Sequence, residues 1–141
     1  MNIILSIHPK WAKLIYEGKK TIEWRKNIPK IDNPVFVFIY ETAPIQKITG
    51  FFTTNETFWQ IHDPIKNDIG IILRGCVERK ELKKYQGNSK FLYGWDIIDP
   101  HKLNLPKKLK EFGLNRPPQS WCYTKLKLTT LERYREDKEN T

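Results

Sequence analysis

Apolar and polar positions alternate with a period that changes several times along the chain, and each change separates two predicted elements. Residues 2–7 are mostly strand formers and predict a first strand. Pro9 suits the first turn of a helix, and Gly18 is a typical cap at a helix end. Between them, an apolar stripe recurs at helical spacing on Trp11, Leu14 and Ile15. Residues 20–25 change to alternation, with Ile22 and Trp24 on one face, and predict a second strand.

The middle and the end of the chain continue this pattern with short elements. Residues 35–40 form an unbroken apolar run, which predicts a strand buried on both faces. Residues 47–54 predict another strand, and Gly50 inside it indicates a bulge or a bend. Residues 55–68 are irregular, and residues 69–73 predict a short strand or a core segment. The other expected elements are a helix at 78–85, a strand at 91–98, helical turns at 106–112 and a strand at 121–128.

The order of these elements indicates the fold class. The five or six short strands and the few short helices do not alternate regularly, which argues against a doubly wound parallel sheet. An α+β fold fits this order best, as a small mixed β-barrel with a few flanking short helices. The length of 141 residues fits one domain, and 39% hydrophobic residues supply its core. We expect the domain at residues 1–127 and a charged C-terminal tail at residues 128–141.

Composition narrows the location and the chemistry. No run approaches the ~18 apolar residues that span a bilayer, and Lys10 and Lys13 interrupt the N-terminal segment, unlike a signal peptide. We therefore expect a cytoplasmic protein with no membrane partner. In that compartment Cys76 and Cys122 are expected to be reduced and buried. Neither these cysteines nor the scattered histidines have metal-site spacing, so the sequence indicates no metal and no cofactor.

The chain is strongly basic, with a net charge of +9. The tail at 128–141 holds three basic and four acidic residues, which leaves 22 basic and 12 acidic residues at 1–127. A domain with this charge attracts polyanions such as nucleic acids. A solvated lysine-rich surface that only aids solubility is the alternative. Basic clusters at 79–90 and at 102–110 are each typical of a solvated helix face, and together they modestly favour nucleic acid.

One segment carries a recognisable motif. Residues 18–25 read Gly-Lys-Lys-Thr-Ile-Glu-Trp-Arg, the pattern G-x-K-x-x-E-x-R, directly after the first helix. Three more segments follow the same order: Leu-Ser-Ile-His-Pro at 5–9, Ile-Tyr-Glu-Thr-Ala-Pro at 39–44 and Pro-Pro-Gln-Ser-Trp-Cys-Tyr at 117–123. Together they resemble the ASCH family over roughly the first 127 residues. The resemblance implies a PUA-like pseudo-barrel with a cleft, and a role with RNA, a nucleotide or a modified base.

The motif supplies the first candidate site. Lys20 and Arg25 can donate to a phosphate or a base carbonyl, and Glu23 can accept from an exocyclic amine or fix the lysine. Glu23 and Arg25 share one face of a strand, whereas Lys20 has the opposite parity. Lys20 joins them only from the turn after Gly18, where we expect it. The alternative is a surface salt-bridge cluster of little energetic value.

Four further residues are candidates for ligand binding. Thr21 belongs to the motif, Tyr40 and Thr42 end a buried strand, and Ser120 follows a rigid Pro-Pro turn. Tyr40 can stack on a base, or it can belong to the core with its hydroxyl satisfied. Ser120 can donate to a ligand or stabilise its turn. Trp11 is most simply a core residue, because it lies on the apolar stripe of the first helix.

The sequence is compatible with three functions, which follow in order of preference. The first is a nucleic-acid-binding module that holds RNA, a nucleotide or a modified base in a basic cleft. The second is a small hydrolase of RNA or of a modified nucleoside, with Lys20 polarising a carbonyl and Glu23 acting as a general base. ASCH-like amidohydrolases of acylated cytidine have a threonine where this chain has Glu23, so that nucleophile is missing. The third is a protein-interaction module. The oligomeric state stays open.

Overall fold

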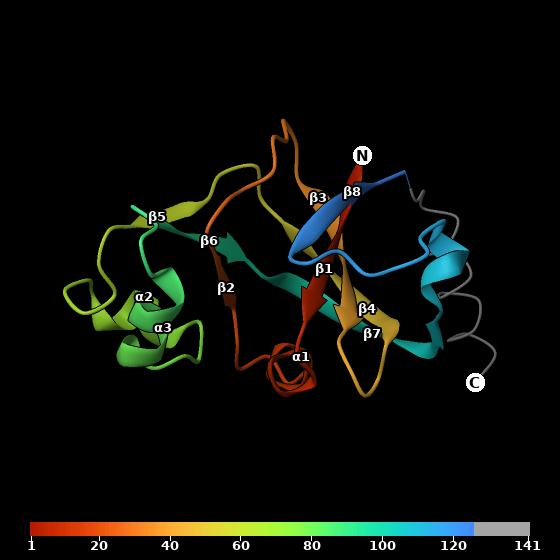
Figure 1. Cartoon of the computed structure of the whole chain (residues 1–141), viewed down its shortest axis with the longest axis horizontal. Coiled ribbons are helices and arrows are strands. Elements are labelled where there is room, and N and C mark those ends of the chain that lie inside the picture. Colours follow the sequence, from red (N-terminus) through yellow and green to blue (C-terminus); the bar gives the residue numbers. More distant parts are fainter. Residues whose placement is uncertain (126–141) are drawn as a thin grey trace.

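Two β-sheets of unequal size organise the molecule, whose structure is a computed structural model describing residues 1–125 (Figure 1). The five-stranded sheet contains, in spatial order, β7 (Ile98–Lys107), β4 (Lys47–Thr54), β3 (Val35–Glu41), β1 (Asn2–Ile7) and β8 (Trp121–Thr124). The three-stranded sheet contains β2 (Ile22–Arg25), β6 (Leu92–Asp96) and β5 (Trp59–Ile61). The helices are α1 (Pro9–Tyr16), α2 (Ile69–Leu73), α3 (Arg79–Gln86) and the 3-10 helix η1 (Leu109–Phe112).

The centre of the larger sheet is buried on both faces. Strands β1 and β3 are parallel neighbours, and the other pairs in this sheet are antiparallel. Ile3 and Leu5 pack into one core cluster, whereas Ile4 packs with Phe38 into a second cluster on the opposite face. Two buried faces require apolar residues at every position. This confirms the interpretation of the apolar run at 35–40.

The smaller sheet has a core of its own. Ile22, Trp24 and Leu92 pack against Ile72 of α2 and Leu82 of α3. Figure 1 shows α2 and α3 beside the smaller sheet, and α1 near the junction of the two sheets. The chain passes directly from β6 into β7, which carries it from the smaller sheet to the larger one. Helix α1 makes a second connection between the sheets, because β1 before it belongs to the larger sheet and β2 after it belongs to the smaller one.

The structure corrects the expected barrel and the expected number of strands. Eight strands lie in the described part of the chain, and their pairings form two open sheets rather than one closed barrel. The α+β class and the short helices are confirmed. Strand β7 was not expected, because it is an edge strand with Pro100 and many exposed polar residues, which hides the alternating pattern.

Two local predictions have different outcomes. Residues 69–73 are helical rather than extended, because the Asp68 side chain accepts a hydrogen bond from the Gly70 backbone N–H at 2.7 Å and caps the helix. The irregularity expected at Gly50 is present, since the pairing of β3 with β4 shifts between Ile39 and Tyr40. A side chain at Gly50 would collide with the backbone of β7 and with a side chain of α1.

Other expectations concern the cysteines, membranes and the tail. Cys76 and Cys122 are free thiols, and both are half-buried rather than buried. Among the described residues, no helix has the length and apolarity that crossing a membrane requires. The tail expected at 128–141 lies outside the described residues.

Candidate functional site

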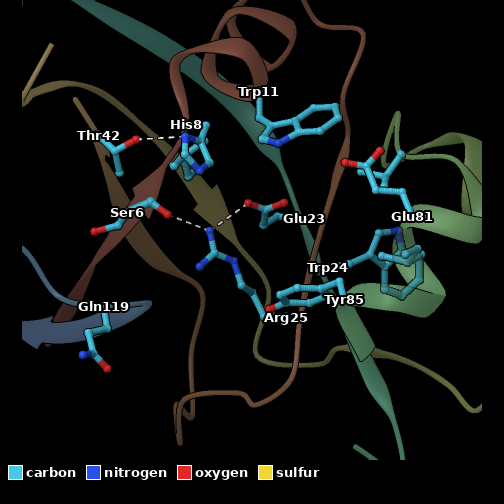
Figure 2. A pocket seen from close by; sticks show the side chains of 13 residues that line it. Ser6, His8, Trp11, Glu23, Trp24, Arg25, Thr42, Glu81, Tyr85 and Gln119 are labelled. Carbon is cyan, nitrogen blue, oxygen red and sulfur yellow. Dashed lines mark hydrogen bonds and ion pairs between the residues drawn. The ribbon is translucent and has the colours of Figure 1, made fainter. Parts of the chain in front are cut away.

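A pocket of about 350 Å³ opens between α1, α3 and the edges of the two sheets (Figure 2). Its size lies in the range of small-molecule sites, ~300–1,000 Å³. The motif strand β2 supplies three of its lining residues, and α3 and the turn before it supply another group. Besides Ile7, the lining residues are Ser6, His8, Trp11, Glu23, Trp24, Arg25, Thr42, Val77, Glu81, Leu82, Tyr85 and Gln119.

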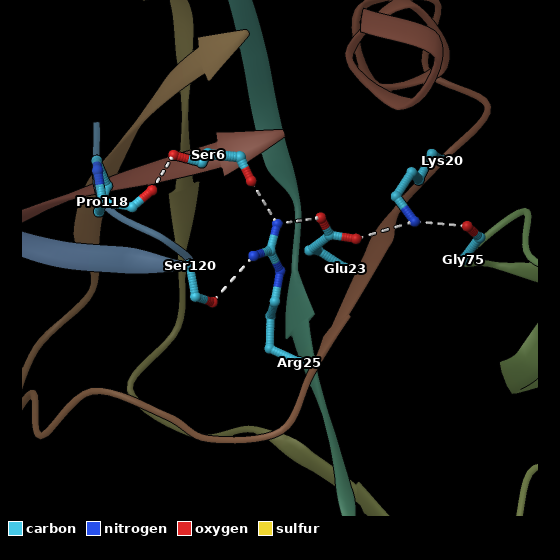
Figure 3. Close-up of polar contacts among 7 residues, drawn as sticks. All are labelled: Ser6, Lys20, Glu23, Arg25, Gly75, Pro118 and Ser120. Atoms are coloured by element: carbon cyan, nitrogen blue, oxygen red, sulfur yellow. Dashed lines mark hydrogen bonds and ion pairs between the residues drawn. The ribbon is translucent and has the colours of Figure 1, made fainter. Parts of the chain in front are cut away.

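The three charged residues of the motif form a continuous chain beside this pocket (Figure 3). We call Lys20, Glu23 and Arg25 the motif triad. Lys20 Nζ lies 3.2 Å from Glu23 Oε1, and Arg25 Nη2 lies 3.0 Å from Glu23 Oε2. The Lys20 side chain is only 1% exposed, and those of Glu23 and Arg25 are 10% and 12% exposed. The triad is therefore a buried network and not the surface cluster of the alternative interpretation.

Lys20 reaches Glu23 because it precedes the regular strand. Gly18 has a left-handed backbone with φ of 76°, which ends α1 and turns the chain. The backbone N–H of Lys20 still donates to Leu14 of α1, at 3.1 Å. From this turn the ammonium group donates to the carbonyl oxygen of Gly75 as well as pairing with Glu23. The turn thus removes the parity conflict between Lys20 and the strand.

Arg25 connects the two sheets. Its Nη2 donates to the backbone carbonyl of Ser6 in β1 at 2.7 Å, and its Nη1 donates to Ser120 Oγ at 3.0 Å. Ser6 Oγ in turn donates to the carbonyl of Pro118 at 2.7 Å. The predicted candidate Ser120 therefore contacts the motif, through Arg25. The guanidinium holds β1, β2 and the segment before β8 in one arrangement.

The carboxyl group of Glu23 stays ionised in this setting. Burial alone would raise the pKa of Glu23, but the nearby charges of Lys20 and Arg25, with their hydrogen bonds, outweigh burial and lower that pKa. The triad thus holds two cations and one anion, a net charge of +1 at neutral pH. Both Glu23 oxygens have partners, so the group is well satisfied without a ligand.

Three other predicted residues lie in different places. Thr21 Oγ1 accepts a hydrogen bond from Arg74 Nε at 3.0 Å and is not a lining residue of the pocket. Tyr40 is 4% exposed and packs in the second core cluster, so the core alternative describes its position. Thr42 does line the pocket, where its Oγ1 lies 3.2 Å from Nδ1 of His8.

Three aromatic side chains line the pocket although none was predicted there: Trp24 of β2, and two whose rings have lysines beside them. Trp11 is half-buried and packs against the core as expected, but it also lines the pocket. Lys10 Nζ lies 4.7 Å and Lys20 Nζ 5.3 Å from the centre of its ring. Tyr85 of α3 is 42% exposed, and Lys26 Nζ lies 4.9 Å from its ring centre. Both rings are therefore flanked by cations.

The sequence held little signal for the α3 side of the pocket. We call Val77, Glu81, Leu82 and Tyr85 the α3 wall. Helix α3 reads as a charged surface helix with one apolar anchor, Leu82, and its residues are far from the motif in sequence. Their place beside β2 follows from the packing of the smaller sheet. His8 and Gln119 were also missed, although both lie within segments that suggested the family.

The chain is similar to known proteins in sequence and in fold. The family model of the ASCH domain matches residues 5–107. The chain therefore belongs to the ASCH family, with its PUA-like fold, as the motif indicated. Solved structures of the ASCH protein from Zymomonas mobilis agree in fold. The chain has 22% identity to that protein, with a TM-score of 0.75 over 96% of this chain and 94% of that one. A Tyr-to-Phe variant of it gives a TM-score of 0.76, also at 22% identity and over 96% of both chains.

Two curated proteins share sequence with the chain. An ASCH domain-containing ribonuclease of Zymomonas mobilis is 40% identical over 48 residues, which is 34% of this chain and 32% of that protein. An ATP synthase subunit alpha of Ureaplasma parvum is 26% identical over 134 residues, which is 88% of this chain. The matched region spans about a third of the ribonuclease and 15% of the synthase subunit.

Proposed function

We propose that this ASCH domain binds single-stranded RNA and takes one unpaired base into the pocket between α1 and α3. The observation that carries the proposal is the pairing of two cation-flanked aromatic rings, Trp11 and Tyr85, with a buried polar network in one pocket of about 350 Å³. Sequence-specific RNA recognition uses this combination, since unstacked bases stack on aromatic rings and form hydrogen bonds along their edges.

The charge of the chain supports a polyanionic ligand. The sequence carries a net charge of +9, and Lys10 and Lys26 lie beside the two pocket rings. A phosphate backbone that crosses the pocket mouth would meet these ammonium groups while a base enters. Such contacts release counterions, so the affinity is expected to fall steeply as salt rises. The ribonuclease among the relatives makes RNA the preferred polyanion.

The binding experiment compares ligands and matched variants. Fluorescence anisotropy with labelled single-stranded RNA, double-stranded RNA and single-stranded DNA, at low and moderate salt, should show preference for single-stranded RNA. Tyr85→Ala should weaken binding about tenfold, since stacking contributes ~1–3 kcal/mol per base. Tyr123→Ala is the control, because Tyr123 is 41% exposed but does not line this pocket. Equal effects of the two variants, or equal binding of duplex RNA, would refute the proposal.

RNA cleavage is the second candidate function, and the position of His8 at the pocket is the observation that favours it. His8 is exposed at the pocket and lies 3.2 Å from Thr42 Oγ1, so one ring nitrogen remains for a ribose 2′-hydroxyl. Histidine is the side chain that most often serves as a general base in enzymes. Glu23 is a poorer base, because Lys20 and Arg25 lower its pKa. In this reaction the 2′-oxygen loses its proton to His8 and attacks the adjacent phosphorus to form the 2′,3′-cyclic phosphate, while the bond from phosphorus to the 5′-oxygen breaks and that oxygen takes a proton from water.

A cleavage assay separates this candidate from binding alone. End-labelled single-stranded RNA is incubated with the wild type and with His8→Asn, and the products are tested for a 2′,3′-cyclic phosphate. Cleavage by the wild type that falls at least tenfold in the variant, with RNA affinity retained, would support catalysis. Intact RNA after incubation with well-folded protein leaves the domain as a binding module.

A further inference from the structure

An exposed aromatic ring lies outside the pocket, on the smaller sheet. Trp59 of β5 is 40% exposed, although Ile61, two residues further on, packs in the core beneath α2 and α3. The exposed indole is nevertheless held in one orientation. Its Nε1–H donates to Asp96 Oδ1 at 3.0 Å, and the guanidinium carbon of Arg74 lies 5.7 Å from its ring centre. A ring that is both exposed and fixed is preorganised to stack on a ligand.

The two faces of this ring differ. The guanidinium of Arg74 covers one face, and Trp59 makes no other aromatic or cationic contact with the described residues. The opposite face is therefore open to a flat partner. Nucleobases stack on such faces whatever their identity, because every base has a π-face.

Arg74 supplies an open donor beside the ring. Its Nε donates to Thr21 Oγ1 at 3.0 Å, and its Nη2 lies 3.3 Å from Asp96 Oδ1. Its Nη1 has no hydrogen-bond partner within residues 1–125, and the side chain is 38% exposed. Two engaged nitrogens fix the guanidinium, and the third can donate to a phosphate oxygen. A stacking face and a phosphate donor together match one nucleotide.

This ring is a close neighbour of the pocket. Gly94 of β6 pairs with Trp24 of β2 on one side and with Trp59 on the other, so the two tryptophan backbones lie roughly 10 Å apart. A Cβ atom at Gly94 would lie 2.9 Å from the Trp24 ring and 3.1 Å from Trp59 Cβ, so glycine permits this approach. Trp24 lines the pocket. Val77, which also lines the pocket, follows Arg74 by no more than ~11 Å of chain.

We propose that Trp59 and Arg74 form a second nucleotide subsite, an inference that rests on the RNA-binding function proposed above. An unpaired base stacks on the open face of Trp59, and Arg74 Nη1 donates to a phosphate of the same strand. The pocket and the second subsite then hold two positions of one RNA. Once the pocket is filled, the second contact is intramolecular, so the two contacts together bind more tightly than either alone. Duplex RNA keeps its bases paired and cannot use the second subsite.

The test varies the length of the ligand. Uridine monophosphate and oligouridines from two to eight nucleotides displace a labelled single strand, and anisotropy gives each affinity for the wild type and for Trp59→Ala. Longer strands also gain affinity from charge, so the measure is the ratio of the two proteins at each length. The ratio should be about one for the monophosphate and at least tenfold for the octanucleotide, the effect of one stacked base. Tyr85→Ala should weaken binding at every length, because Tyr85 belongs to the pocket.

Further variants separate stacking from packing. Trp59→Phe keeps an aromatic ring and should retain most of the affinity for the octanucleotide, whereas Trp59→Leu should lose it; urea denaturation checks that both variants fold. Leu73→Ala is the control, because Leu73 precedes Arg74, is 64% exposed and has no ring. It should bind like the wild type. Arg74→Gln should reduce the slope of log affinity against log salt by about one, since one phosphate contact is lost.

The outcomes separate the two proposals. Equal octanucleotide affinities of the wild type and Trp59→Ala, with Tyr85→Ala still weakened, would overturn the second subsite and leave RNA binding intact. Equal losses in Trp59→Phe and Trp59→Leu would also overturn it. No binding of any oligonucleotide by folded wild-type protein would overturn the RNA-binding function, and the second subsite with it.

A measurement on the wild type decides the question even if the Trp59 variants do not fold. Octanucleotides that carry a photoreactive iodouridine at each position in turn are irradiated in the complex, and the cross-linked peptides are identified by mass spectrometry. At least one position should cross-link to Trp59 while another cross-links to Trp11 or Tyr85 in the pocket. Cross-links confined to Trp11 and Tyr85 would overturn the second subsite.

Discussion

The motif triad and the α3 wall border the same pocket but differ in how their polar groups are satisfied. Every charged group of the triad has a partner within the protein, and Lys20 is almost completely buried. In the α3 wall, Glu81 has no partner in the described part of the chain and Tyr85 is 42% exposed. The motif triad thus satisfies its own charges, whereas the wall leaves a carboxylate and an aromatic ring open to the pocket.

The two regions also differ in how strongly they are tied to the rest of the fold. Arg25 ties the motif to β1 and to the segment before β8, so a change there would disturb both sheets. The α3 wall lies on one surface helix that is anchored by Leu82. Its exposed positions can change with little effect on the core. We infer that the motif specifies the architecture of the pocket and that the wall sets its selectivity, in line with the separation of fold and function.

The largest expected effect comes from removing the charge of Glu23. Glu23→Gln keeps the shape of the side chain but leaves Lys20 and Arg25 buried without an anion. We expect the free energy of unfolding to fall by about 3–5 kcal/mol in urea denaturation. Glu17→Gln is the control, because Glu17 also lies 3.2 Å from a lysine, Lys19, but these side chains are 36% and 65% exposed. It should cost less than about 1 kcal/mol. Similar losses in both variants would show that burial is not the cause.

The second prediction concerns pH. The pKa of Glu23 is lower in the folded protein than its ordinary value of 4.5, so the unfolded chain binds this proton more readily. The stability from Glu23 is therefore complete above that ordinary value and is lost as the pH falls through the folded-state pKa. Urea unfolding at a series of acidic pH values should show the wild type approaching Glu23→Gln as the pH falls. The pKa of Asp63 is also lowered, first by a hydrogen bond from the Ile65 backbone, and its effect should be common to both proteins. A constant gap would contradict the prediction.

The sequence predicted elements well where burial dictates a regular period. The strand predictions at 2–7 and 47–54 agree closely with β1 and β4, because these strands have apolar or small residues on buried faces. Helix α1 has a proline at its start and a left-handed glycine just beyond its end. Strand β7 has neither signal, since it pairs along one side only and exposes most of its residues. Strand β7 is fixed by its pairing with β4, and this long-range pairing is not encoded in the local sequence of β7.

For the candidate site, the sequence likewise predicted one part, the motif triad, and not the other, the α3 wall. The convergence of Lys20, Glu23 and Arg25 follows from strand parity and the turn at Gly18, both of which are local. The α3 wall was not predicted, because Tyr85 and Glu81 reach the pocket only through the packing of α3 on the smaller sheet. Long-range placement of this kind leaves no periodic signal in the chain.

The third prediction tests how tightly the triad and the indole of Trp24 are fitted together. A Cβ atom at Gly75 would lie 2.5 Å from Nε1 and 2.7 Å from Cδ1 of Trp24, so Gly75→Ala must displace the ring. Gly75 also accepts from Lys20 through its carbonyl. We expect a loss of about 1–3 kcal/mol in the free energy of unfolding. Gly70→Ala is the control, since a Cβ there meets only the Asp68 side chain, at 3.0 Å, and should be tolerated. Equal stability of the two variants would show that the indole can move freely.

The smallest expected effect on stability lies in the α3 wall. Glu81→Ala removes an exposed carboxylate that has no partner among the described residues, and alanine favours the helix. The free energy of unfolding should change by no more than about 0.5 kcal/mol in urea denaturation. Glu23→Ala, across the same pocket, should show a loss several times larger, because it leaves two buried cations unpaired. A destabilisation by Glu81→Ala as large as that of the triad variant would mean that α3 is part of the framework, and that the wall cannot vary independently of the motif.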